Sequence, residues 1–169
     1  MADYFKTITD DQADLIHNAE LFFVASADPT LGIGPHDVGP VNLSPKGGVP
    51  LHIVDRNRVA YLDYTGSGNE TARHSMAGGP ITVMVCSFAQ ENAAVVRLYG
   101  KATITSVADS PLGPQLMDSP ATEIALPERQ VIDIVVDSTV TSCGYGVPVM
   151  NEFRDRKVAD RGRRYKDRK

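Results

Sequence analysis

The sequence predicts a mainly β protein with few helices, folded as a small antiparallel barrel of Greek-key type. About six or seven short segments are rich in β-branched and aromatic residues, and Gly- and Pro-rich stretches separate them. Helical segments are few and do not alternate regularly with strands, which argues against a doubly wound nucleotide-binding fold. Because an open sheet of this size leaves unpaired edges, closure into a barrel is the expected arrangement.

The composition sets the class of protein. The chain has 169 residues, of which 42% are hydrophobic, and this is enough for one domain with its own core. A net charge of −4 argues against a globally basic nucleic-acid binder, and no apolar run approaches the ~20 residues of a membrane-spanning helix. Two cysteines and an N-terminus without a signal-peptide pattern favour a cytoplasmic location.

Two helices are expected from their end signals. Thr9 and Gln12 have the spacing of a capping box, which predicts a helix that begins directly after Thr9. A second helix is expected over residues 70–77, with Asn69 as its N-cap and the glycines at 78 and 79 as its end.

The strands are expected where apolar residues cluster. A turn over 55–58 predicts a hairpin between the two flanking strands. Pro45 supplies no amide donor, so the segment before it is expected at a sheet edge or a strand end. Residues 111–127 are expected to be helical or irregular. The predicted strands are 21–25, 41–44, 51–54, 59–64, 81–88, 94–104, 131–136 and 138–142.

The strongest candidate site is the strand–loop–helix segment 64–73 (YTGSGNETAR). The first amides of a helix lack internal acceptors and favour an anion, and glycines allow such a group to approach the backbone. Three hydroxyl groups and Arg73 add further donors, so phosphate is the expected ligand. A capped loop that simply enters a helix is an equally weighted alternative, and the acidic Glu70 favours it.

Two basic residues are weaker candidates. Lys46 follows Pro45 and is a candidate contact for an anion or a cofactor, with an exposed turn lysine as the alternative. Arg97 interrupts an apolar strand and shares a face with Tyr99. If Arg97 is buried it needs an anion or an acid, and the alternative is an outward-facing arginine on a half-exposed strand.

The segment 142–148 (SCGYGVP) places Tyr145 between two glycines, where its ring could lie beside a flat ligand. Cys143 has no assignable His or acidic partner and is expected to be a buried structural cysteine. The four histidines and two cysteines lack the spacing of metal ligands, so no metal site is expected.

The charge distribution divides the chain into a domain over residues 1–150 and a basic tail over 151–169. The tail is expected to be solvated, or docked on an acidic face of its own or a partner protomer. Polyanion binding by the tail is the less favoured alternative.

Five segments in this order resemble the pyridoxamine 5′-phosphate oxidase-related family of FMN-binding split-barrel proteins. The likeness is closest to the branch with the Cys-Gly-Tyr-Gly-Val-Pro motif, and it runs from about Phe5 to Met150. The segments are 42–47 (NLSPKG), 59–63 (VAYLD), 65–73 (TGSGNETAR), 97–100 (RLYG) and 142–148 (SCGYGVP).

The resemblance implies a six-stranded split β-barrel that forms a homodimer with FMN in the grooves between protomers. It also implies a flavin-dependent oxidoreductase acting on a small molecule, with a non-catalytic flavin carrier or sensor as the alternative. No catalytic residue is assigned. The residues expected to bind the cofactor are Ser44, Lys46, Tyr64, Thr65, Ser67, Gly68, Asn69, Thr71, Arg73, Arg97 and Tyr145.

The chain departs from the oxidases at three features. Asn69 and Glu70 stand where the oxidases have an Arg-Lys pair at the FMN phosphate, and Val95 stands at a glutamine position near the flavin. The chain also has no tryptophan. These departures argue against oxidation of pyridoxamine phosphate itself.

Overall fold

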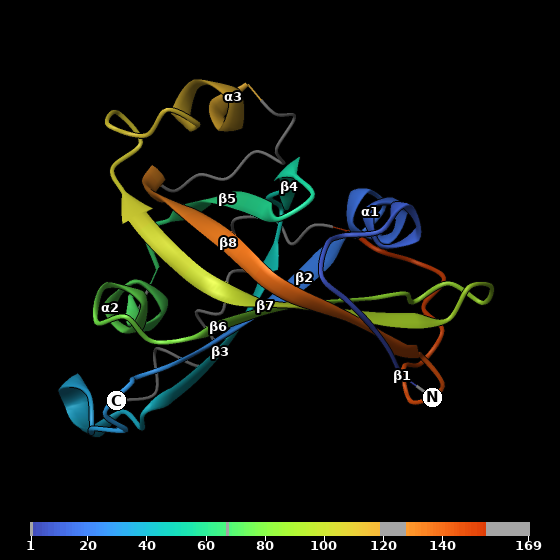
Figure 1. Ribbon diagram of the computed structural model, residues 1–169, viewed down its shortest axis with the longest axis horizontal. Coiled ribbons are helices and arrows are strands. Elements are labelled where there is room, and N and C mark those ends of the chain that lie inside the picture. The colour runs from blue at the N-terminus through green and yellow to red at the C-terminus, as the bar shows by residue number, and fades with distance from the viewer. Residues whose placement is uncertain (1, 67, 119–127, 155–169) are drawn as a thin grey trace.

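A computed structural model describes residues 2–66, 68–118 and 128–154. These residues form eight strands, three α-helices and one short 3-10 helix (Figure 1). The strands are β1 (Ala2–Phe5), β2 (Leu21–Ala27), β3 (Val41–Gly47), β4 (His52–Asp55), β5 (Arg58–Tyr64), β6 (Ile81–Cys86), β7 (Ala94–Thr105) and β8 (Glu128–Cys143). The helices are α1 (Asp10–His17), η1 (Pro35–Asp37), α2 (Glu70–Met76) and α3 (Gly113–Met117).

The strands form one antiparallel sheet in the order β3-β2-β6-β7-β8-β5-β4, with β1 added against β8. The connection from β5 to β6 runs through α2 and joins strands that are not neighbours in the sheet. The ends of this order, β3 and β4, do not pair with one another. The predicted mainly β fold is therefore confirmed, and the barrel is split along one side, between β3 and the β4–β5 hairpin.

The strand number differs from the expected six. The structure has eight strands, and the one that the sequence did not predict as a segment is β1. Its four residues are all exposed and have no alternating pattern, so only its backbone pairing with β8 defines it. The segments predicted separately at 131–136 and 138–142 form the single strand β8. The prediction of an edge at 41–44 is confirmed, because β3 ends the sheet order, and Pro45 lies within it.

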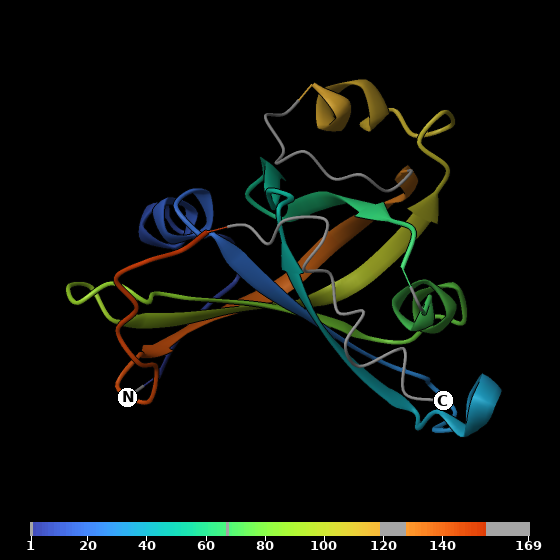
Figure 2. The ribbon, with the colours of Figure 1, turned by 180° about the vertical axis from the view of Figure 1, so that it is seen from behind.

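Alternation along the strands fills the barrel. In β2 every second residue is buried, so Phe22 and Val24 point into the core while Phe23 and Ala25 face outward. The Phe22 ring meets the Tyr61 ring of β5 edge to face at a centroid distance of 5.3 Å. A second, smaller cluster lies beneath α3. Figures 1 and 2 show the three α-helices around the margins of the long, curved sheet.

The predicted capping box at the start of α1 and the predicted glycine after α2 are both found. The Thr9 hydroxyl accepts a hydrogen bond from the backbone N–H of Gln12 at 3.3 Å. In return, the side-chain oxygen of Gln12 accepts from the backbone N–H of Thr9 at 3.1 Å, which completes the predicted capping box. Helix α2 ends one residue earlier than expected and is followed by Gly78 at φ 83°, a conformation that favours glycine. The basic segment 155–169 and residues 119–127 lie outside the described residues.

Candidate functional site

A polar groove of about 470 Å³ lies along the split of the barrel. We call it the split groove. Its walls come from β3, the end of β5, the following loop and the start of α2. The lining residues are Val38, Asn42, Ser44, Pro45, Lys46, Asp63, Tyr64, Gly66, Gly68, Asn69, Glu70 and Thr71.

An ion pair crosses the split groove. Lys46 Nζ donates to Asp63 Oδ1 at 2.8 Å, and the two side chains are only 22% and 10% exposed. Lys46 points inward because it pairs in register with the buried Phe22, and its ammonium group lies 5.7 Å from the Tyr61 ring centroid. Lys46 is therefore a strand residue inside the split, and the alternative of an exposed turn lysine is wrong.

Gln130 links Asp63 to the loop before α2. Its side-chain amide donates to Asp63 Oδ2 at 3.0 Å and to Asn69 Oδ1 at 2.8 Å. Asn69 is the N-cap residue of α2, as predicted, but its side chain makes no capping hydrogen bond and accepts from Gln130 instead. Asp63 thus receives a donor on each carboxylate oxygen.

A second set of hydrogen bonds ties β3 to α2. The Asn42 side-chain amide donates to Ser44 Oγ and to Thr71 Oγ1, both at 3.1 Å. These residues lie on the inward face of β3 and on the first turn of α2. The hydroxyl groups of Ser44 and Thr71 therefore lie within one wall of the split groove.

Arg129 fixes the loop between β5 and α2. Its guanidinium donates to the Gly68 carbonyl at 2.7 Å and to the Gly66 carbonyl at 3.1 Å. Sequence reasoning missed Arg129 and Gln130, which precede the apolar part of β8. It also missed Asp63, although an acid within the apolar segment 59–64 was an available signal.

Glu70 bends back across the loop. A Cβ atom added to Gly68 would lie 2.2 Å from Glu70 Oε2, so the carboxylate covers the position that a side chain at residue 68 would take. Both residues line the split groove. A carboxylate therefore stands in the same wall as the donors of Asn42 and Thr71.

Two tyrosines of β5, Tyr61 and Tyr64, have raised pKa values and stay uncharged near neutral pH. Burial, followed by the charge of Asp63, raises the pKa of Tyr61 well above its usual value. Burial, followed by Glu128, raises the pKa of Tyr64. The split groove offers hydroxyls, amides and one ammonium group paired with Asp63, together with the Glu70 carboxylate, and the uncharged donors and acceptors suit a ligand with a polyol chain.

Arg73 lies away from the split groove. Its guanidinium donates to Asp28 Oδ2 at 3.3 Å and lies 3.0 Å from His74 Nε2. A Cβ atom added to Gly34 would meet Arg73 Nη2 at 2.4 Å, so the side chain extends towards the loop between β2 and β3. The hydroxyl of Thr30, followed by its backbone amide, lowers the pKa of Asp28, and Arg73 adds a smaller contribution.

The other predicted residues are scattered. Arg97 is half-buried on the outer face of the sheet and donates to Ser142 Oγ at 3.1 Å, while Leu98 points into the core, as the predicted alternation requires. Tyr145 is 96% exposed. Thr65 is exposed in the loop and is not part of the lining, and Ser67 lies outside the described residues.

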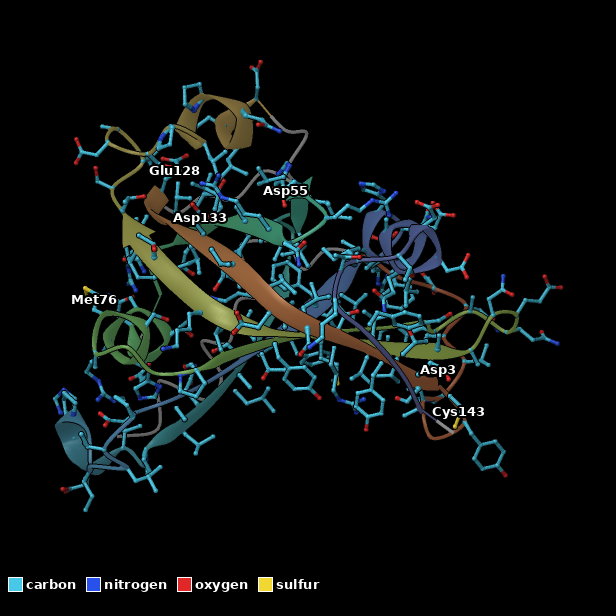
Figure 3. The ribbon with its side chains drawn as sticks, in the orientation of Figure 1. Asp3, Asp55, Met76, Glu128, Asp133 and Cys143 are labelled. Atoms are coloured by element: carbon cyan, nitrogen blue, oxygen red, sulfur yellow. The ribbon has the colours of Figure 1, made fainter. Side chains whose placement is uncertain are left out.

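Cys143 is exposed, so the prediction of a buried structural cysteine is wrong. It is the last residue of β8, where the strand leaves the sheet. Figure 3 shows Cys143 at the opposite end of the molecule from Met76 of α2, and so far from the split groove.

The outer face of the sheet carries a row of mostly apolar residues, which we call the outer row; its Tyr4 is 77% exposed and its Val140 is buried. Across the strands, Pro45 pairs with Phe23, Phe23 with Met84, Met84 with Arg97, Arg97 with Val140 and Val140 with Tyr4. Beside this row, Val41 and Leu43 of β3 are more than half exposed. Exposed apolar side chains such as Tyr4, Val41 and Leu43 on one face of a sheet are typical of an interaction site.

A larger hollow of about 600 Å³ lies between α1 and the turn from β6 to β7. Its most buried polar side chain, Gln12, is hydrogen-bonded to Thr9, Thr139 and Thr141 and so belongs to the packing of α1.

Within the described residues, no three His, Cys, Asp or Glu side chains gather as a metal site requires. None of the described helices has the length and hydropathy to span a membrane.

Comparison with known proteins places this geometry in context. No family model matches the chain. A protein of Aspergillus flavus named pyridoxamine 5′-phosphate oxidase family protein ustO is 30% identical over 154 residues, which are 89% of this chain and 58% of the relative. The chain thus spans less than two thirds of the curated relative's length.

Solved structures give the same fold at low identity. A protein of Lactobacillus delbrueckii provisionally named pyridoxamine 5′-phosphate oxidase matches 80% of this chain and 94% of its own, with a TM-score of 0.57 and 17% identity. An FMN-binding protein of Syntrophomonas wolfei matches 76% and 86%, with a TM-score of 0.55 and 10% identity. The FAD binding protein of Mycobacterium smegmatis matches 82% and 97%, with a TM-score of 0.52 and 10% identity. The chain therefore has the split-barrel fold of pyridoxamine 5′-phosphate oxidase-like proteins and is a relative of a protein named for that family.

Proposed function

We propose that this chain binds FMN in the split groove and acts as a cytoplasmic, flavin-dependent oxidoreductase on a small molecule. The observation that carries the proposal is the convergence of donors from β3, β5 and α2 on one groove. The names of the S. wolfei and M. smegmatis proteins, which share the fold, support a flavin as the ligand class.

The groove suits most of an FMN molecule. Hydroxyl groups of Ser44 and Thr71 and the amide of Asn42 match the hydroxyls of a ribityl chain, and Lys46 is the one cationic side chain among the lining residues. Glu70 is the part of the lining that opposes an anionic phosphate. Bound flavin would supply the redox chemistry, and the protein residues bind and orient it.

The cofactor contacts that we propose come from the lining. They are Ser44, Lys46, Tyr64, Gly68, Asn69 and Thr71, together with Asn42 and Asp63, which sequence reasoning did not select. Arg73 supports this site from outside, through the loop that contains Asp28. We assign the flavin domain to residues 1–150 and treat residues 151–169 as an appended basic tail.

We also propose a homodimer that uses the outer sheet face. Val41, Leu43 and Pro45 lie on the reverse side of β3, whose inner face lines the split groove, and the outer row continues from Pro45 across the sheet. A second copy on this face would bury that surface and bring Arg97 to the interface.

Flavin titration tests the proposal. Purified apoprotein is expected to quench FMN fluorescence in a saturable manner, and Lys46→Ala is expected to weaken binding. Absence of saturable binding by the wild-type protein would overturn the proposal.

A second experiment separates an enzyme from a carrier. Reduction of the bound flavin by NADH or NADPH with steady turnover supports an oxidoreductase, whereas flavin that stays oxidised supports a carrier or sensor. The carrier alternative is favoured by the hydrogen bonds that Asp63 accepts from Lys46 and from Gln130, which leave neither Lys46 nor Asp63 as a free acid or base.

A further inference from the structure

The carboxylate of Glu70 occupies space that an anionic ligand group would need. Its three carboxyl atoms all lie within 3 Å of the position that a Cβ at Gly68 would take, so the group lies against the loop backbone. Glu70 is half-buried and lines the split groove beside Thr71. A ligand group reaching the loop between Gly68 and Thr71 therefore meets this carboxylate.

The balance of charge in the lining is negative. Lys46 is neutralised by its ion pair with Asp63 at 2.8 Å. Glu70 forms no ion pair with any of the described residues. Arg129, the cation fixed to this loop, directs its guanidinium to the carbonyl oxygens of Gly66 and Gly68.

Such a lining distinguishes ligands by their charge. A ribityl chain is uncharged and finds hydroxyl and amide partners, whereas a phosphate dianion in the same groove is repelled by the Glu70 carboxylate. The Glu70 carboxylate repels only the phosphate of FMN, because the rest of the flavin is neutral. Riboflavin, which lacks the phosphate, is therefore not repelled.

We propose that Glu70 sets the selectivity of the split groove between flavins with and without a terminal phosphate, disfavouring FMN relative to riboflavin. This inference rests on the proposed binding of flavin in the groove. Glu70 acts here as a specificity-determining residue through its charge, and removing that charge makes the groove more receptive to phosphate.

The test compares dissociation constants of riboflavin and FMN for the wild-type protein, Glu70→Gln and Glu128→Gln. Both variants lose one negative charge and keep the shape of the side chain. Glu128 is exposed and close enough to raise the pKa of Tyr64, but it is not part of the lining, so it is the matched control. Thermal unfolding of each variant verifies that the fold is retained.

In Glu70→Gln, the ratio of the FMN to the riboflavin dissociation constant is expected to fall by about tenfold, the size of a close charge–charge repulsion partly screened by water. Riboflavin affinity is expected to stay unchanged, and Glu128→Gln is expected to alter the ratio much less. A ratio unchanged in Glu70→Gln, or lowered equally in Glu128→Gln, would overturn the inference while leaving flavin binding intact. Failure of both flavins to bind any of the three proteins would overturn the proposed function and the inference with it.

Discussion

Lys46 of β3 and Asp63 of β5 form an ion pair of 2.8 Å across the side of the barrel where their strands share no backbone pairing. Elsewhere around the sheet, described neighbouring strands are joined by ladders of backbone hydrogen bonds. At the split, side chains connect the two sides of the barrel. The hydrogen bond from Asn42 to Thr71 is a second connection beside the ion pair of Lys46 and Asp63. The groove proposed to bind the ligand is therefore also the place where the barrel is closed.

Removal of the ammonium group should cost stability. Lys46→Met is expected to lower the free energy of unfolding by about 1–3 kcal/mol, because Asp63 keeps its charge in a mostly buried position and loses one of its donors. Denaturant unfolding measures the change. Asp10→Asn is the control, since it breaks the exposed ion pair with Arg56 and is expected to cost no more than about 1 kcal/mol. Equal losses in the two variants would contradict a closing role for Lys46.

Local signals in the sequence predicted much of the fold. The capping box of α1 depends on Thr9 and Gln12 alone, and the hairpin of β4 and β5 depends on the polar turn between them. Pro45 marked β3 as an edge strand because proline cannot donate to a neighbour. Signals of this kind depend on residues a few positions apart, so they can be recognised without knowledge of the tertiary structure.

The connections within the site could not be predicted in this way. Gln130 lies 67 positions from Asp63 and 61 from Asn69, and nothing local to Gln130 indicates either partner. The sequence indicated Lys46 as a candidate but gave no means to pair it with Asp63. Arg73 was expected at the phosphate because it follows the loop, yet the direction of its side chain depends on Asp28, which lies 45 positions earlier.

The position of Arg73 predicts a structural effect of its removal. Arg73→Ala is expected to lower the melting temperature, because the contact to Asp28 in the loop between β2 and β3 and the contact to His74 of α2 are lost. FMN affinity is expected to change by no more than about twofold, far less than a direct phosphate contact would give. Differential scanning fluorimetry and FMN titration of the same variant measure both effects. A large loss of affinity with unchanged stability would place Arg73 at the cofactor.

Asp28 should make stability depend on pH in the acidic range. Hydrogen bonds from Thr30, and the nearby Arg73, lower the folded-state pKa of Asp28 below its ordinary value of 3.8. The ionised carboxylate therefore stabilises the fold above that value, and the stabilisation is lost as the pH falls through the lower folded-state pKa. The wild-type protein is expected to have a higher melting temperature than Asp28→Asn at neutral pH, and the difference is expected to narrow as the pH is lowered below 3.8. A gap that stays constant over this range would contradict the assignment.

The outer sheet face predicts a change in oligomeric state. Leu43 is 66% exposed on β3, so Leu43→Glu places a charge on the proposed interface without disturbing the core. Light scattering is expected to give the mass of a dimer for the wild-type protein and of a monomer for this variant. Met117→Glu on α3 adds the same charge at an exposed apolar residue away from this face and should remain dimeric. A monomeric wild-type protein, or dissociation by both substitutions, would contradict the proposed interface.

Gln130 is expected to couple the stability of the split to ligand affinity. In Gln130→Leu, Asp63 Oδ2 and Asn69 Oδ1 both lose their donor, while the volume of the side chain is nearly conserved. Because Gln130 is buried, the variant should lose about 1–3 kcal/mol of unfolding free energy, as expected for unsatisfied buried polar groups. FMN and riboflavin should both bind more weakly, since Asn69 and Asp63 are no longer held in the groove wall. Gln115→Leu on the exposed side of α3 serves as the control and should affect neither quantity. Weaker binding of FMN alone would indicate that Gln130 acts on the phosphate and not on the shape of the groove.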